Sequence, residues 1–292
     1  MKLKPRHKRE LEHIGRKTQR YIDHLRVYPR ANVMLDKVVM AHVSKALNVA
    51  RGVVCLLNCG LPEEAFAQSR TLVEVGFNLR FITNKDSERR ARRFVDYFAV
   101  WKAEQIRRAL KHFKSDKKDQ LGIPLPKYTK AQLQREAPNY AFFARRARKF
   151  PNPGSWTQAS KKKRGSVWKM AMEPDKHGER DLLGAPATWE FDYDWIYFWT
   201  SQYVHATVVS MDSHAVLPTQ VFKVYVAPQL GEHTAGLAIF NTALYLSKIL
   251  AMAFRAIGHD FPSDLSTPLG DLLHELASDE PKFKTSKQTS RN

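Results

Sequence analysis

The 292-residue sequence contains only two cysteines, Cys55 and Cys59. So few cysteines exclude a small secreted domain held together by disulfides, and they favour a reducing compartment such as the cytoplasm. The two residues share one helix face in an apolar segment, but a pair of thiols lacks the further ligands that a zinc site needs. We therefore expect two buried free thiols.

Motifs for phosphates, nucleotide cofactors and metals are also missing. The sequence contains no glycine-rich phosphate loop, no dinucleotide fingerprint and no nucleophile elbow. His259 and Asp260 form half of a metal phosphohydrolase motif, but no partner histidines stand at helical metal spacing. His205 and His214 are nine residues apart, hence on opposite faces of a helix. We therefore expect no cofactor and no metal.

Long uninterrupted hydrophobic runs are few. The most apolar segment, residues 235–256, is interrupted by Asn241, Lys248 and Arg255. We interpret this segment as a core helix, and we expect no membrane span. The basic N-terminal segment is not followed by the apolar stretch of a signal peptide.

Acidic residues are scarce relative to basic ones. The chain has 29 Asp and Glu against 48 Lys and Arg, which gives a formal net charge of +19. This excess favours a polyanionic partner, most often nucleic acid, although a soluble protein with a Lys/Arg-rich surface has the same composition. Attachment to a membrane surface has less support, because no amphipathic segment combines its cations with a protruding apolar face.

The positive charge is concentrated in two segments. Residues 1–30 contain ten basic and three acidic residues, and residues 127–169 contain twelve basic and one acidic. Aromatic residues alternate with the cations of the second segment, which suits a single-stranded nucleic acid, and we expect RNA rather than DNA. A solvated loop explains the same composition. The predicted nucleic-acid contacts are Arg145, Arg146, Arg148, Trp156, Lys161, Lys162, Lys163, Arg164 and Trp168.

Apolar residues recur at helical spacing through most of the chain, which predicts an all-α protein, a single bundle-like domain of about seven helices. We expect a basic N-terminal helix in residues 1–30, a helical core in 31–278 with a loop insertion at 151–186, and a disordered polar tail at 279–292. Residues 221–226 alternate as in a strand but have no obvious partner. The expected helices span residues 4–27, 32–58, 62–83, 87–113, 129–150, 189–214, 234–257 and, briefly, 269–276.

The segment 61–82, LPEEAFAQSRTLVEVGFNLRFI, is apolar nearly all round, which is typical of a buried helix. Arg70 and Glu74 lie in its middle, four residues apart. Two charges on a buried helix should be paired and desolvated. The pair is either a structural ion pair that clamps helices together, or an anion-binding or catalytic arginine oriented by its carboxylate.

A second polar group lies in the aromatic-rich segment 189–214. Tyr197, Ser201 and His205 are spaced four residues apart, so they form a stripe along one helix face. A lone histidine on such a helix is usually a satisfied core residue. Three polar groups in register between large aromatic side chains favour a lined cleft.

An R-x-L-x-E motif at residues 70–74 and a later Y-x-x-x-S-x-Y-x-H motif at residues 197–205 together resemble a bacterial family of unassigned role, domain of unknown function 5677. The Arg-Arg-Phe-x-x-Tyr run at residues 92–97 is similar too, and the resemblance covers roughly residues 38–213. It implies an all-helical fold and no settled activity. Similar helical proteins of the HEPN superfamily include RNA-cutting toxins of phage defence, and that extension is an analogy.

The first hypothesis is a nucleic-acid-targeting protein, either a metal-independent endoribonuclease or an effector of the phage-defence or toxin type. In its composite site His205 would serve as base or acid for the 2′-hydroxyl, and Arg70 would stabilise the phosphorane charge. Glu74 would orient Arg70, and Ser201 or Tyr197 would hold the phosphate. The Arg-x4–6-His pattern of those ribonucleases also occurs at residues 6–13 and 107–112, about as often as chance predicts.

The second hypothesis is a non-catalytic RNA-binding or scaffolding protein in which Arg70 and Glu74 form a structural ion pair. Both hypotheses leave a homodimer open. Both also depend on how the helix at 62–83 faces the segment at 189–214, which the sequence does not determine.

Overall fold

The computed structural model describes residues 4–25, 34–113, 142, 145, 170, 189, 192–197, 200, 215–216, 223–224 and 231–278. Within these residues there are six α-helices, one short π-helix and one two-stranded ladder, which confirms the predicted all-α class. The elements are α1 (Pro5–Leu25), α2 (Met34–Asn58), α3 (Pro62–Asn84), α4 (Ser87–Phe113), η2 (Asp192–Tyr197), β1 (Ala215–Val216), β2 (Lys223–Val224), α10 (Gly231–Ala256) and α11 (Ser263–Ser278).

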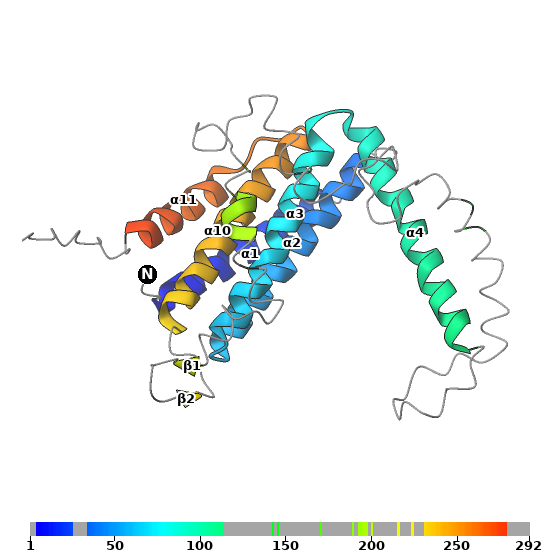
Figure 1. The fold of residues 1–292 in the computed structure, drawn as a ribbon. Coiled ribbons are helices and arrows are strands. Elements are labelled where there is room, and N and C mark those ends of the chain that lie inside the picture. The colour runs from blue at the N-terminus through cyan, green and yellow to red at the C-terminus, as the bar shows by residue number, and fades with distance from the viewer. Residues whose placement is uncertain are drawn as a thin grey trace, which may run out of the picture.

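Helices α2, α3 and α10 form the centre of a bundle, with α11 along the outer side of α10 (Figure 1). Helix α1 packs on α2 and α11. The core is made of side chains from all these helices, and α3 is buried on both sides, as its sequence predicts. Among the fully buried core residues are Ile14, Leu47, Phe77, Leu79, Tyr245 and Ile249.

Local sequence explains where α3 begins. Gly60 has a φ of 75°, a left-handed conformation that glycine adopts without strain, and it ends α2. The Leu61 amide then donates to the Leu56 carbonyl at 2.9 Å. Pro62 and the carboxylates of Glu63 and Glu64 occupy the first turn of α3, where a missing amide proton and negative charge are both favourable.

Helix α4 leaves the bundle after its first turns (Figure 1). The helical spacing of Ala91 and Phe98 predicts that both side chains face the core. Ala91 is buried, but Phe98 is 53% exposed, so the prediction is wrong for Phe98. The start of α4 is fixed because Glu88 accepts hydrogen bonds from the amides of Met34 and Leu35, at 3.2 and 2.9 Å, at the N-terminus of α2. These amides hold the pKa of Glu88 below its usual value.

Several boundaries differ from the predictions. Residues 223–224 do have a partner strand, because Val224 pairs with Ala215 in an antiparallel ladder. Helix α11 begins at Ser263 rather than near residue 269. Its buried leucine stripe offsets the unfavourable Pro268 inside the helix. Apart from residues 142, 145 and 170, the helix predicted at 129–150 and the loop at 151–186 lie outside the described residues, as does the tail at 279–292.

Cys55 and Cys59 are exposed, so the prediction of buried thiols is wrong. Cys55 lies near the end of α2 and Cys59 directly follows this helix, and both line a surface groove beside α1. By length and hydropathy, Met34–Asn58 and His233–Ala256 are each able to cross a membrane. In this structure both segments lie at the centre of the bundle, with more than half of their apolar windows buried.

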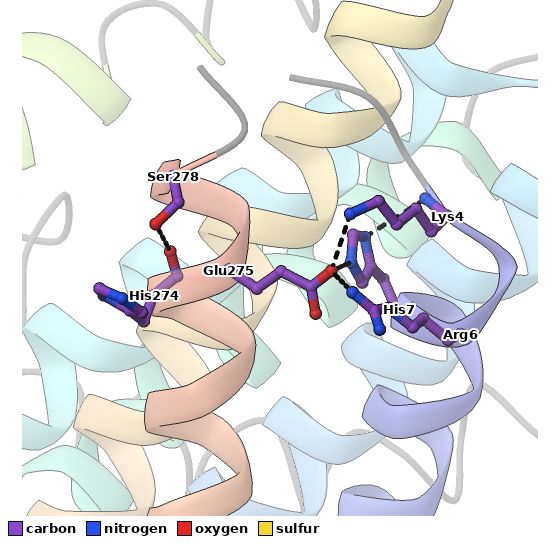
Figure 2. Close-up of polar contacts among 6 residues, drawn as sticks. All are labelled: Lys4, Arg6, His7, His274, Glu275 and Ser278. Atoms are coloured by element: carbon purple, nitrogen blue, oxygen red, sulfur yellow. Dashed lines mark hydrogen bonds and ion pairs between the residues drawn. The ribbon is translucent and has the colours of Figure 1, made fainter.

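The N-terminal turn of α1 is joined to α11 by one carboxylate. Figure 2 shows Glu275 of α11 pointing toward Lys4, Arg6 and His7. Its Oε1 atom lies 3.0 Å from Lys4 Nζ and 2.9 Å from Nε2 of His7, and it also accepts a hydrogen bond from Arg6. The His7 ring is buried, and its Nδ1 atom accepts the Lys4 amide at 3.3 Å, as in a capping box.

We expect this contact to be lost in acid. The neighbouring His7 ring, with Lys4 and Arg6, lowers the pKa of Glu275 from 4.5 to about 2. A carboxylate with a depressed pKa in the folded state stabilises it above the unfolded pKa and stops doing so as the pH falls through the folded pKa. The difference in melting temperature between the parent protein and Glu275→Gln should therefore be largest near neutral pH and shrink between pH 4.5 and pH 2. A difference that stays constant from pH 6 to about pH 3 contradicts this assignment.

Candidate functional site

Arg70, in the middle of α3, is held by two partners from different parts of the chain. Its Nη2 atom donates a hydrogen bond to the Tyr197 hydroxyl of η2 at 2.7 Å. Its Nε atom lies 3.2 Å from Oε1 of Glu74, one helical turn further along α3. The guanidinium carbon lies 4.5 Å from the centre of the Tyr197 ring, within cation–π distance. The hydrogen bond to Tyr197 and the charge of Glu74 therefore restrict where the guanidinium group lies.

The two charges are not equally buried. The Arg70 side chain is 16% exposed, whereas the Glu74 side chain is 39% exposed. The prediction of a desolvated pair is therefore correct for the arginine and wrong for the glutamate, which lies at the rim where α3 meets solvent. Water partly screens an ion pair of this kind, so its Coulombic attraction alone is small. The hydrogen bond from Arg70 to Tyr197 is better shielded from water than the ion pair with Glu74.

Tyr197 acts as a neutral acceptor for Arg70. Burial raises the pKa of the Tyr197 hydroxyl, and the hydrogen bond from Arg70 only partly opposes this shift. The hydroxyl therefore remains protonated at neutral pH, and its oxygen accepts the hydrogen bond from Arg70.

The π-helix η2 packs against α3 through aromatic rings. Tyr193 and Tyr197 lie one above the other, with ring centres 5.1 Å apart and planes 16° apart. Phe77 of α3 lies 6.2 Å from each of these two rings. Single-turn π-helices occur frequently at functional sites, because the wider turn redirects side chains. Here the turn presents Tyr197 directly over Arg70.

A second pair of charges joins η2 to α10. Asp192 Oδ2 lies 2.6 Å from Lys248 Nζ, and the two side chains are 6% and 16% exposed. The ammonium group also lies 4.9 Å from the Trp189 ring and 5.3 Å from the Tyr245 ring. Burial, and then the charge of Asp192, raises the pKa of Tyr245 well above its usual value. This pair anchors the start of η2, and thus the position of Tyr197.

Trp189 fills the space between α3 and α10. Its ring lies against Gly76, where an added Cβ would come within 3.0 Å of the indole, and it packs edge-on against Tyr245. Arg80 is only 2% exposed, and its guanidinium carbon lies 5.0 Å from the same ring. The sequence pattern did not identify Arg80, Asp192 or Lys248 as parts of the site. The available signal was Lys248, one of the three polar residues that interrupt the most apolar segment of the sequence.

The structure brings together three of the five predicted catalytic residues, Arg70, Glu74 and Tyr197. Ser201 and His205 lie outside the described residues, so their proposed roles stay predictions. Of the predicted nucleic-acid contacts only Arg145 is described, and it is exposed. Within the described part of the chain no group of three or more His, Cys, Asp or Glu side chains is placed to hold a metal ion.

Residues 36–220, more than half of the chain, match a family model described as "Family of unknown function (DUF5677)". The chain belongs to this family. Comparison with curated proteins and with solved structures finds no match. The DUF5677 segment includes α2, α3, α4 and η2, so both sides of the Arg70–Tyr197 contact lie within it. Helix α10, which supplies Lys248, lies beyond the matched segment and completes the core of the bundle.

Proposed function

We propose that this DUF5677 protein binds RNA, and that Arg70 contacts a phosphate of the strand where α3 meets η2. The observation that carries the proposal is that Arg70 is hydrogen-bonded to Tyr197, 127 residues further along the chain, and ion-paired with Glu74. A guanidinium group that its neighbours hold in a partly desolvated position is suited to oxyanions, because water screens its charge less there than at the surface. The net charge of +19 favours a polyanionic partner.

The proposal extends to cleavage of the strand without a metal. His205 would remove the proton of a 2′-hydroxyl, whose oxygen then attacks the neighbouring phosphorus. The bond from phosphorus to the 5′-oxygen would break, and that oxygen would take up a proton, leaving a 2′,3′-cyclic phosphate and a 5′-hydroxyl. Arg70 would stabilise the charge that develops on the phosphorane oxygens, while Tyr197 or Ser201 would hold the phosphate.

A non-catalytic RNA-binding protein is the second candidate, and one observation favours it. The Arg70 guanidinium carbon lies over the Tyr197 ring, and Tyr197 belongs to the aromatic cluster that packs η2 against α3. In this case Arg70 joins α3 to η2, and Glu74 helps to orient the Arg70 side chain. RNA would then bind elsewhere on the cationic surface, and no variant of Arg70 would change a chemical step.

RNA binding itself is tested by a salt series. We expect an unstructured RNA oligonucleotide to bind more tightly than single-stranded or duplex DNA of the same sequence. For single strands the logarithm of the affinity falls by about 0.7 per phosphate contact for each logarithmic unit of salt, so four contacts predict a roughly 50-fold loss between 50 and 200 mM salt. Fluorescence anisotropy gives the affinities. Absence of binding at the lower salt concentration contradicts the proposal, and so does an affinity that salt leaves unchanged.

A further inference from the structure

The two cysteines of the chain lie in one surface groove. Cys55 and Cys59 are both exposed, and both line a groove of about 420 Å³ between α1 and α2. The amide of Cys59 donates to the carbonyl of Cys55 at 3.0 Å, a helical hydrogen bond that places the two thiols one turn apart. The lining comes from α1, from α2 and from Cys59 itself, so the thiols are not part of the contact between Arg70 and Tyr197.

The helical spacing of the thiols decides what can join them. Residues four apart on a helix have Cβ atoms about 5–6 Å apart, whereas a disulfide requires about 3.5–4.5 Å. A disulfide between Cys55 and Cys59 therefore requires the end of α2 to unwind. A metal ion between two thiolates needs less, because metal–sulfur bonds of about 2.3 Å place the sulfurs about 4.6 Å apart in a linear arrangement. Each sulfur extends one bond beyond its Cβ, so both reach this separation while the helical turn is kept.

The number of ligands selects the kind of ion. Within the described part of the chain no group of three or more His, Cys, Asp or Glu side chains is placed to hold a metal ion. Structural zinc sites take four protein ligands, and iron–sulfur clusters are held by four cysteines, so a thiolate pair satisfies neither. Thiolates also select Cu(I), and this soft ion is satisfied by two sulfur ligands in a line. A pair of thiols one helical turn apart therefore fits Cu(I).

The charge of the groove suits this complex. Cu(I) displaces one proton from each thiol to solvent, so a cation of charge +1 and two thiolates form a complex of charge −1. Arg51 is exposed, lines the groove and precedes Cys55 by one helical turn. Arg16 lies 3.8 Å from Glu12, whereas no carboxylate pairs with Arg51 among the residues that the structure describes. The Arg51 guanidinium group is thus available to balance the negative charge.

We propose that Cys55 and Cys59 bind one Cu(I) ion between two thiolates, with Arg51 beside the negatively charged complex. This site goes beyond the proposed function, because it requires neither RNA nor Arg70. It also replaces the expectation of no metal, which rested on missing zinc ligands and missing partner histidines. Bound Cu(I) ties the last turn of α2 to Cys59 and blocks both thiols.

A copper titration of the full-length protein tests the site. The reduced protein is titrated with Cu(I) under anaerobic conditions, in competition with bicinchoninate, whose Cu(I) complex is coloured. We expect one ion per chain. Trypsin releases both cysteines in one peptide, residues 52–70, so mass spectrometry after N-ethylmaleimide treatment counts the labelled thiols. With one equivalent of Cu(I) bound, labelling of both thiols should slow together.

Thiol variants show whether the two sulfurs share one ion. Cys55→Ser and Cys59→Ser should each weaken binding by about 10²- to 10⁴-fold, because the second ligand then no longer binds within the same molecule. The matched control combines Ala41→Cys with Cys55→Ser. It keeps two exposed thiols but places them 18 residues apart, about 27 Å along the helix, so it should bind no better than the single variants.

A second pair of variants tests the role of charge. Arg51→Ala should weaken Cu(I) binding about two- to fivefold, the usual range for a partly screened surface charge. Lys45→Ala is the control, since it removes an exposed cation of α2 that does not line the groove, and it should leave the affinity unchanged. Equal effects of the two variants contradict the role of Arg51.

The remaining outcomes decide the site itself. One ion per chain that is lost in both single variants and in the displaced-thiol control supports the proposal. Two ions per chain, parental affinity in the displaced-thiol control, or no competition with bicinchoninate overturns it. One ion per two chains, with a dimer detected by light scattering, also overturns it, because the ion then joins two molecules. The salt series with RNA is measured without copper, so the proposed function stands or falls separately.

Discussion

Replacing Arg70 by alanine is expected to lower the rate of metal-independent RNA cleavage by about 10²- to 10³-fold, the usual effect of removing one donor that stabilises a developing oxyanion. RNA affinity should change far less, because most of it comes from other phosphate contacts. The measurement is single-turnover cleavage of an end-labelled RNA in EDTA. Arg255→Ala is the matched control, since it removes an exposed arginine at the end of α10.

Two conservative variants separate chemistry from structure. Arg70→Lys keeps the charge but lacks the planar guanidinium group that donates to Tyr197 and lies beside Glu74, so it should recover only part of the rate. Tyr197→Phe keeps the ring and removes the hydroxyl that accepts from Arg70, so it should slow cleavage while the fold persists. If Arg70→Ala unfolds the protein and both conservative variants cut at the parental rate, Arg70 is a structural residue and the catalytic proposal is wrong.

Of the substitutions considered for this site, breaking the Asp192–Lys248 pair is expected to lower the free energy of unfolding the most. Removing one partner leaves the other charge buried, which typically costs 3–5 kcal/mol, and the 16% exposure of Lys248 favours the lower end, about 3 kcal/mol. For a chain of this size that corresponds to a fall in melting temperature of roughly 6–12 °C. Asp192→Asn and Lys248→Met each test this by thermal unfolding. Arg89→Met, at an ion pair whose arginine is 80% exposed, should cost less than about 1 kcal/mol.

The double variant shows whether the pair is held by charge or by shape. Asp192→Leu combined with Lys248→Met removes both charges and keeps most of the buried volume, so it should be much closer to the parent protein than either single variant. The two single variants should also loosen η2, and with it the hydrogen bond between Tyr197 and Arg70. If the single and double variants lose the same stability, the two charges are not coupled.

Much of the helical architecture was predictable because it depends on local signals. Gly60 and Pro62 mark the junction of α2 and α3, and the apolar pattern of α3 predicts a helix that is buried on both sides. The course of α4 was not predictable in the same way. Phe98 has helical spacing with Ala91, yet it is exposed because α4 diverges from the bundle, and that angle depends on tertiary packing.

The candidate site was predictable only in part. Arg70 and Glu74 stand out because charges on a buried helix need an explanation, and Tyr197 because it begins a polar stripe. The contact between Arg70 and Tyr197, which lie 127 residues apart, depends on tertiary packing. The same holds for the pairing of Asp192 with Lys248. Sequence spacing also did not show that Glu74 lies at the rim and that the two thiols face a groove, since solvent exposure is set by which helices pack on which face.

The claim that Arg70 contacts RNA is tested most directly by mapping which side chains lie next to a bound RNA strand. A 2′-O-methylated oligonucleotide carrying 4-thiouridine cannot be cut through its 2′-oxygen and forms a covalent bond to nearby side chains under long-wave ultraviolet light. We expect a crosslink to Tyr193 or Tyr197, identified by mass spectrometry of the digested complex, and we expect Arg70→Ala to reduce it. Crosslinks confined to peptides outside α3 and η2, and unchanged by Arg70→Ala, would contradict the claim that Arg70 contacts RNA.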